Sequence, residues 1–201
     1  MKDNLENQIG TKGTVPSVPK RASNRSDSSC GYLAEKSKAV FFDRDGVLNV
    51  DKDYLHSIDE LEWIDGAKDA VVYLTKAGYT VFVVTNQSGI ARGYYEVEDM
   101  QRLHEHMAAE ISAVGGKITK FYYCPHLPTG KVKKYAIECN CRKPKPGLLL
   151  QAMSEYPICK ENSFLIGDKK RDLESAEAAG IRGYLYENGN LLEFVKKIVD
   201  R

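Results

Sequence analysis

Short apolar runs alternate with amphipathic segments along most of this chain, and this alternation limits its fold more than any other feature. Several of the amphipathic segments end at a glycine, as helices often do. The predicted strands are residues 39–42, 80–85, 118–123, 163–166 and 182–186, and the predicted helices are residues 67–77, 97–114, 147–155, 172–179 and 191–198. Strands that alternate with helices indicate a parallel sheet with right-handed crossovers. The predicted fold class is therefore α/β, a doubly wound parallel sheet of the Rossmann type.

The first apolar run ends in two aspartates, Asp43 and Asp45, followed at once by Gly46. Side chains at i and i+2 of an extended backbone point the same way, so both carboxylates are expected in one small volume. Carboxylates held together favour a metal ion between them, or a pair in which one partner is protonated. Taken alone, such a pair more often forms a solvated acidic turn, and only the rest of the chain favours a catalytic site.

Three further polar clusters lie at strand ends or before a helix. Thr85-Asn86 ends the second predicted strand, Asp168-Lys169 follows the fourth, and Arg142-Lys143 leads into a predicted helix. The carboxyl ends of neighbouring parallel strands share one edge of the sheet, so these side chains should meet there. Any one of them alone would be read as part of a surface ion pair. Together, the carboxylates, the hydroxyl-amide pair and the cations suit a phosphate monoester held with a divalent cation.

In chain order the four clusters read D-R-D-G-V-L-N, T-N-Q-S-G-I-A-R-G, C-R-K-P-K-P-G and G-D-K-x-x-D. They resemble motifs I to IV of the haloacid dehalogenase (HAD) superfamily of phosphatases. Within it they look like the D-glycero-D-manno-heptose 1,7-bisphosphate 7-phosphatase and histidinol-phosphatase branch, over about residues 38–190. Ser88 favours the heptose enzyme, because the histidinol branch tends to carry a different residue there. The resemblance implies an HAD-like fold.

The resemblance also implies a role for each cluster in phosphate ester hydrolysis. Asp43 would attack phosphorus and form an aspartyl-phosphate, and Asp45 would serve as general acid and then general base. Mg²⁺ would be held by the Asp43 carboxylate, the Asp45 main-chain carbonyl and Asp168. Thr85 and Lys143 would complete the catalytic group. The expected substrate-binding residues are Asp51, Lys52, Asp53, Tyr54, Thr85, Asn86, Gln87, Ser88, Arg142, Lys143 and Lys169.

Further expectations concern Arg142, the loop from Asp51 to Tyr54, and Asp172. Arg142 would recognise the substrate, because a guanidinium can bind phosphate through two parallel hydrogen bonds. The loop from Asp51 to Tyr54 would contact substrate, although an exposed turn is an equal alternative. Asp172 would either support the metal ligands or merely cap its helix.

Four metal-binding side chains form two short hooks, Cys124-Pro125-His126 and Cys139-Asn140-Cys141. A set of three cysteines and one histidine is typical of tetrahedral structural zinc, and the branch named above has the same loop. The alternative is a loop of unligated thiols. A closed four-ligand site leaves no open position for catalysis, so the zinc is expected to hold the loop that places Arg142 and Lys143.

Composition narrows the remaining choices. With 29 Lys and Arg against 28 Asp and Glu, the net charge of +1 does not indicate a nucleic-acid-binding protein, and no apolar stretch is long enough to span a membrane. Residues 1–36 are polar with few large apolar side chains and are interpreted as a disordered tail, ahead of an HAD-like domain over residues 37–201. The spacing of the four clusters leaves no room for a cap domain. The five cysteines are odd in number, and three of them lie within 18 residues; together with the lack of a secretory signal, this favours the cytoplasm.

Three functions remain open at this point. The favoured one is release of the C7 phosphate of D-glycero-D-manno-heptose 1,7-bisphosphate, for nucleotide-activated heptose in lipopolysaccharide or surface glycans. The expected partner is then a small sugar phosphate bound by a monomer. The second is hydrolysis of histidinol phosphate or of a DNA 3'-phosphate. The third is a catalytically silent, zinc-stabilised binding domain, against which the presence of both Asp43 and Asp45 argues.

Overall fold

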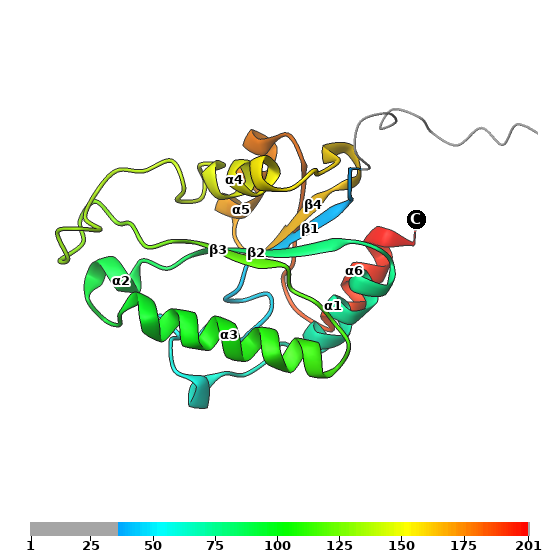
Figure 1. Cartoon of the computed structure of the whole chain (residues 1–201), viewed down its shortest axis with the longest axis horizontal. Helices are drawn as coiled ribbons and strands as arrows, with labels where there is room; N and C mark the ends of the chain where they lie inside the picture. The colour runs from blue at the N-terminus through cyan, green and yellow to red at the C-terminus, as the bar shows by residue number, and fades with distance from the viewer. Residues whose placement is uncertain (1–35, 201) are drawn as a thin grey trace, which may run out of the picture.

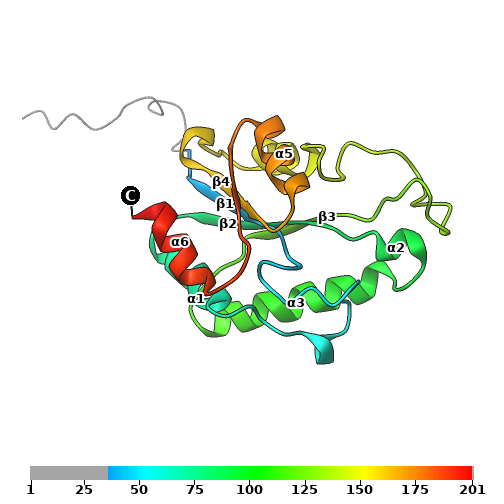
Figure 2. The same ribbon diagram turned by 180° about the vertical axis from the view of Figure 1, so that it is seen from behind.

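The computed structural model describes residues 36–200, and its centre is a five-stranded sheet between two layers of helices (Figures 1 and 2). Adjacent strands are parallel throughout. In spatial order the strands are β3 (Lys120–Cys124), β2 (Thr80–Asn86), β1 (Ala39–Phe42), β4 (Phe164–Gly167) and β5 (Arg182–Leu185). The predicted α/β class with a doubly wound parallel sheet is confirmed.

Helices cover both faces of the sheet, so its strands are apolar on both sides. They are α1 (Ala67–Lys76), α2 (Gly89–Arg92), α3 (Val97–Ala113), α4 (Gly147–Glu155), α5 (Lys170–Ala179) and α6 (Leu191–Val199), with 3-10 turns η1 (Ile58–Glu60) and η2 (Lys160–Asn162). Figure 1 shows α1, α3 and α6 on one side and α4 and α5 on the other. A hydrophobic core lies on each face of the sheet, and successive side chains of β1 enter these cores in turn. Val40 and Phe42 belong to one core, and Ala39 and Phe41 belong to the other.

The order of the strands reverses at β1, and this reversal is called the switch point of the sheet. From β1 the chain runs outward through β2 to β3, and then returns to β4 on the other side of β1. The backbone N–H of Asp43 donates to the carbonyl of Ile166 at 2.9 Å, which joins the two strands at this point. Ligands of open α/β sheets bind at such a reversal of strand order.

All ten predicted elements are present, with ends that differ by at most two residues. The sequence did not predict α2, because its four residues are too few to show a helical period. Arg92 N–H donates to the Ser88 carbonyl at 3.1 Å, and Gly93, with φ 73°, ends the turn. Helix α5 begins two residues earlier than predicted, because the Asp172 side chain accepts from Lys169 N–H at 3.0 Å and closes its first turn.

Only η1 and α1 lie between β1 and β2, and only α2 and α3 lie between β2 and β3. Within residues 36–200 there is thus no inserted cap domain, as predicted.

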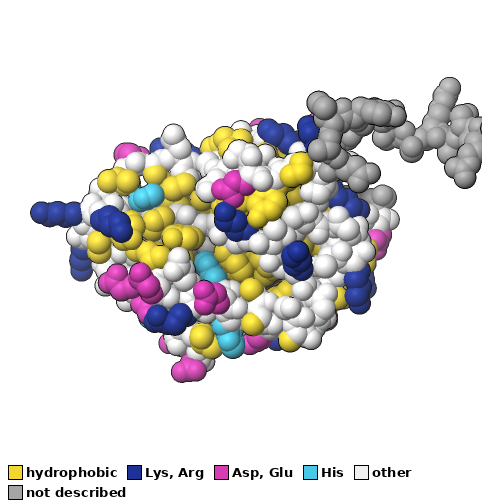
Figure 3. Space-filling view, viewed as in Figure 1, with side chains coloured by type: hydrophobic (Ala, Val, Ile, Leu, Met, Phe, Trp, Pro, Cys, Tyr) yellow, Lys and Arg dark blue, Asp and Glu magenta, His cyan; other side chains and the backbone are white. Residues whose placement is uncertain are grey.

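No helix in this range is both long and apolar enough to cross a bilayer. On the face shown in Figure 3, basic and acidic side chains are interspersed. The predicted tail, apart from Lys36, lies outside the described residues.

Candidate active site

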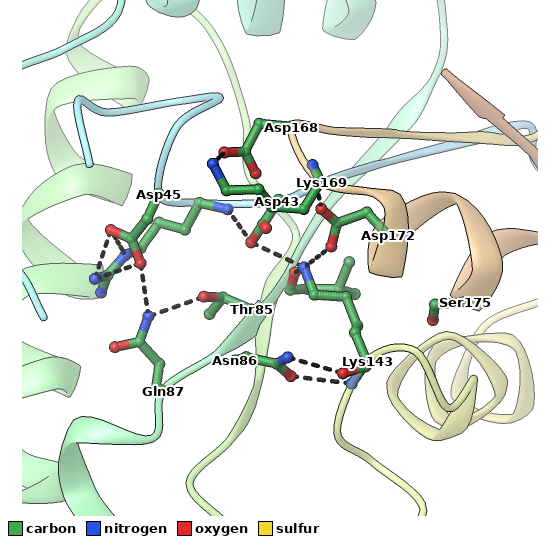
Figure 4. A network of polar contacts seen from close by, with 12 residues as sticks. Asp43, Asp45, Thr85, Asn86, Gln87, Lys143, Asp168, Lys169, Asp172 and Ser175 are labelled. Carbon is green, nitrogen blue, oxygen red and sulfur yellow. Dashed lines mark hydrogen bonds and ion pairs between the residues drawn. The ribbon is translucent and has the colours of Figure 1, made fainter. Parts of the chain in front are cut away.

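The Asp43-Arg44-Asp45 turn leaves β1 at the switch point (Figure 4). Asp43 is only 4% exposed, and its Oδ1 accepts from Arg44 N–H at 2.7 Å. Gly46 has φ 83°, and a Cβ at this position would lie 2.4 Å from Asp168 Oδ2. A glycine is therefore needed both for the backbone conformation and for the close approach of Asp168.

The Asp45 carboxylate has its own set of donors. Its Oδ1 accepts from Arg44 at 2.9 Å and from Asn49 Nδ2 at 3.0 Å, and its Oδ2 accepts from Gln87 Nε2 at 3.0 Å. Arg44 is fully buried, and its NH1 lies 3.2 Å from His104 Nε2. These contacts fix the orientation of the Asp45 carboxylate.

Lys143 is the buried cation of the site and is 2% exposed. Its Nζ lies 2.9 Å from Asp43 Oδ1 and 2.7 Å from Asp172 Oδ1, and it donates to the Val84 carbonyl at 2.8 Å. The Asn86 amide bonds both the N–H and the carbonyl of Lys143, at 3.0 and 3.1 Å, and so fixes its backbone. Figure 4 shows Lys143 reaching between the two carboxylates.

Burial and charge act against each other in this cluster. Burial raises the pKa of Asp43 to about 7, although the Lys143 ammonium lowers it in part. Burial disfavours the charged form of Lys143, but Asp43 and Asp172 outweigh it and hold its pKa above the ordinary value. Asp43, the candidate nucleophile, therefore depends on nearby positive charge to keep its carboxyl group ionised.

Three carboxylates, those of Asp43, Asp168 and Asp172, offer oxygens that all lie within 4.8 Å of one another. Asp168 Oδ1 is buried and has no hydrogen-bond partner among residues 36–200, whereas its Oδ2 lies 2.7 Å from Lys169 Nζ. Oxygen ligands of this kind are those that Mg²⁺ prefers, so the donor set fits a hard divalent cation. The carboxylate of Asp45, expected close to that of Asp43, is not part of this group, and the metal contact expected from Asp45 is its main-chain carbonyl.

Asp172 was expected either to support the metal ligands or to cap its helix, and its position suits both. One oxygen accepts from Lys169 N–H, and the other faces Lys143.

A cavity of about 350 Å³ opens beside this cluster. It is lined by Asp45, Asp51, Asp53, Tyr54, Asn86, Gln87, Ser88, Arg92, Tyr95, Arg142, Lys169 and Arg171. Most of the predicted substrate-binding residues are in this set. Thr85 and Lys143 are buried and do not line it. Lys52 does not line it either, and its Nζ lies 2.9 Å from Glu62.

Arg92, Tyr95 and Arg171 line the cavity but were not predicted. Arg92 lies in the T-N-Q-S-G-I-A-R-G motif, but its place one helical turn after Ser88 depends on α2, whose four residues are too few to show a helical period. Tyr95 had no local signal either, because its position depends on packing. Its hydroxyl donates to Gln87 Oε1 at 2.5 Å, and its ring stacks on His56 with centroids 4.8 Å apart.

The two cysteine-containing hooks come together at the end of β3. Cys124 Sγ lies 3.6 Å from Cys139 Sγ and 3.1 Å from Cys141 Sγ, and His126 Nδ1 lies 3.3 Å from Cys141 Sγ. Ligand atoms of a tetrahedral zinc with bonds of about 2.3 Å to sulfur are about 3.8 Å apart. The four side chains therefore fit zinc, and Cys141 directly precedes Arg142.

Comparison with known proteins gives close relatives. A family profile described as HAD-hydrolase-like matches residues 140–193. The D-glycero-beta-D-manno-heptose-1,7-bisphosphate 7-phosphatase of Rhodopseudomonas palustris is 39% identical over 166 residues, which cover 83% of this chain and 92% of that protein. The protein of the same name from Pasteurella multocida is 46% identical over 145 residues, 72% of this chain and 78% of the relative.

Solved structures agree with these relatives. A putative HAD-like phosphatase from Mesorhizobium loti has a TM-score of 0.72 at 32% identity, covering 77% of this chain and 74% of that one. D,D-heptose 1,7-bisphosphate phosphatase from B. bronchiseptica, complexed with magnesium and phosphate, has a TM-score of 0.68 at 34% identity, covering 80% and 86%. The fold, the site and these relatives define an enzyme of the HAD-like phosphatase class. More narrowly, the chain belongs to the family of the heptose bisphosphate phosphatases named above.

Proposed function

We propose that the protein removes the C7 phosphate of D-glycero-β-D-manno-heptose 1,7-bisphosphate in a Mg²⁺-dependent reaction. The observation that carries this proposal is the polar cavity lined by Asp45, two residues after Asp43, in a chain that aligns with 92% of a relative bearing that name. The product would serve the synthesis of nucleotide-activated heptose for lipopolysaccharide or surface glycans.

In the first step, Asp43 attacks phosphorus and the ester oxygen leaves. The contacts of the carboxylate with Lys143 and Arg44 N–H are both made through Oδ1, so we assign the attack to Oδ2. Asp45 is the general acid, because its carboxyl group lines the cavity and is held in one orientation. Its proton passes to the leaving alkoxide, and an aspartyl-phosphate forms on Asp43.

In the second step, Asp45 takes a proton from water, which attacks phosphorus and frees Asp43 and inorganic phosphate. The Thr85 hydroxyl already accepts from Gln87 at 2.8 Å, so its own hydrogen is available for a phosphoryl oxygen. The Lys143 ammonium offsets the charge that develops on those oxygens. Asn86, expected to bind phosphate, has the additional task of positioning Lys143.

The carboxylates of Asp43 and Asp168 and the main-chain carbonyl of Asp45 would hold Mg²⁺, with Asp172 beside them. When bound, the cation supplies positive charge against the phosphate and the ionised Asp43.

We further propose that Zn²⁺ at Cys124, His126, Cys139 and Cys141 is structural and fixes the loop that carries Arg142 and Lys143. A thiolate-bound zinc suits a reducing compartment, which supports a cytoplasmic enzyme. We propose that it acts as a monomer, because the described chain supplies all the catalytic groups assigned above. Neither nucleic acid nor a membrane has a part in this proposal.

Phosphate release with Mg²⁺ from heptose 1,7-bisphosphate, histidinol phosphate and a DNA 3'-phosphate tests the proposal. We expect kcat/KM for the heptose substrate to exceed that for histidinol phosphate by at least about a hundredfold, the size of two charge-assisted contacts. The Arg142 guanidinium would repel the ammonium of histidinol phosphate. Equal efficiency, or a preference for histidinol phosphate, would overturn the substrate assignment. Absence of hydrolysis would favour a silent binding domain.

A further inference from the structure

The four cations that line the cavity differ in what surrounds them. Lys169 lies 2.7 Å from Asp168, and Arg142 donates to the His126 carbonyl at 3.4 Å. Arg171 is exposed to solvent on α5. Arg142 is half-buried, and like Arg171 it is in none of the ion pairs found within residues 36–200; Arg92 is half-buried and is in none of them either. Its Nε is buried and has no hydrogen-bond partner among the described residues.

Arg92 is nevertheless held in a defined place. It is the last residue of α2. The carbonyl of the preceding residue, Ala91, accepts from the N–H of Val132 at 2.9 Å, and Val132 lies in the loop between His126 and Cys139. Its guanidinium carbon lies 5.6 Å from the centre of the Tyr54 ring. The Tyr54 ring in turn meets Tyr94 edge to face, with centroids 4.9 Å apart. An aromatic ring attracts a cation without accepting its in-plane hydrogens, so the guanidinium donors remain available.

The backbone beside Arg92 is also unusual. Asp53 and Tyr54 have φ of 50° and 67°, a left-handed conformation that residues other than glycine seldom adopt. A strained backbone conformation persists only where surrounding contacts stabilise it, which is common at functional sites. Here this conformation places the Tyr54 ring against Arg92. The cation, the ring and the strained loop thus form one wall of the cavity.

We propose that Arg92 binds the second phosphate of the substrate, the one that is not cleaved, and selects bisphosphates over monophosphates. This inference rests on the proposed function, since it presumes a sugar bisphosphate with its reacting phosphate at Asp43. A half-buried cation that lacks a counter-ion is stabilised by a bound anion. A guanidinium can bind a phosphate through two parallel hydrogen bonds, which a lysine cannot reproduce.

The test compares kcat/KM for heptose 1,7-bisphosphate and heptose 7-phosphate, which differ only in the second phosphate. The variants are Arg92→Gln, which removes the charge, and Arg92→Lys, which keeps it. Arg182→Gln is the matched control, because this exposed arginine begins β5 at the opposite end of the sheet. Hydrolysis of p-nitrophenyl phosphate by each variant shows that the folded reaction centre is intact.

For Arg92→Gln we expect the preference for the bisphosphate to fall at least about tenfold, mainly through KM, with less than about a threefold change on p-nitrophenyl phosphate. Arg92→Lys should retain part of the preference, and Arg182→Gln all of it. An unchanged preference in Arg92→Gln would overturn the inference and leave the proposed function intact. A wild-type enzyme that does not hydrolyse the bisphosphate would overturn both.

Discussion

Replacing Lys143 by methionine should damage both stability and catalysis, because this residue is the counter-charge of two buried carboxylates. Its Nζ contacts Asp43 and Asp172 at 2.9 and 2.7 Å, and it is 2% exposed. Methionine has a similar volume but no charge. The variant would therefore leave the two acidic groups facing each other, without the cation that stabilises them.

The magnitude follows from the burial of the pair. Removing one partner of a buried ion pair costs about 3–5 kcal/mol. For a chain of this length that corresponds to a fall in Tm of roughly 6–20 °C. Loss of a positioned group that stabilises developing charge lowers kcat by about 10²–10³-fold.

Urea unfolding and heptose bisphosphate hydrolysis would measure the two effects. Unfolding should be followed without Mg²⁺ but with zinc retained, so that no added cation replaces the ammonium. The control is the double variant Lys143→Met with Asp172→Asn, which also removes one of the two negative charges. It should recover at least about 1 kcal/mol of the lost stability, because the two sites are in direct contact.

A loss below about 1 kcal/mol in the single variant would refute the reasoning, since an unpaired buried charge costs more. A double variant less stable than the single one would refute it as well, because the removed carboxylate would then not be a repulsive partner of Asp43.

Three other predictions concern individual groups of the site. Asp43→Asn should lower phosphate release by several orders of magnitude with an unchanged circular dichroism spectrum, and near-wild-type turnover would exclude an aspartyl-phosphate. Elemental analysis should find about one zinc per chain, and protein with reduced cysteines but no zinc would contradict the proposed zinc site. Cys139→Ser should raise KM more than it lowers kcat. Arg142→Ala should narrow the preference for heptose bisphosphate over histidinol phosphate more than it slows p-nitrophenyl phosphate hydrolysis, and equal losses would argue against substrate recognition by Arg142.

Much of the fold could be predicted because its signals are local. The strand at Ala39–Phe42 is four consecutive apolar residues, and the helix at Gly147–Glu155 has apolar residues at helical spacing; both have the predicted bounds. The four motifs end strands or begin helices, so the rule for the carboxyl edge of a parallel sheet predicted where they meet.

What the sequence could not predict depends on contacts between distant residues. Arg44 is fully buried beside His104, sixty positions later, although an arginine in a turn is normally expected at the surface. Lys52, expected to bind substrate, does not line the cavity and forms an exposed ion pair with Glu62, a contact that no local pattern indicates. The shared burial of Asp172 and Lys143 likewise follows from packing and not from any local pattern.

The identity of the phosphate that leaves tests the central claim most directly. Phosphorus NMR of heptose 1,7-bisphosphate incubated with the enzyme and Mg²⁺ resolves the two phosphate esters and free phosphate. We predict loss of the C7 signal, with equal formation of inorganic phosphate and heptose 1-phosphate. Accumulation of heptose 7-phosphate, or persistence of both ester signals, would contradict the account.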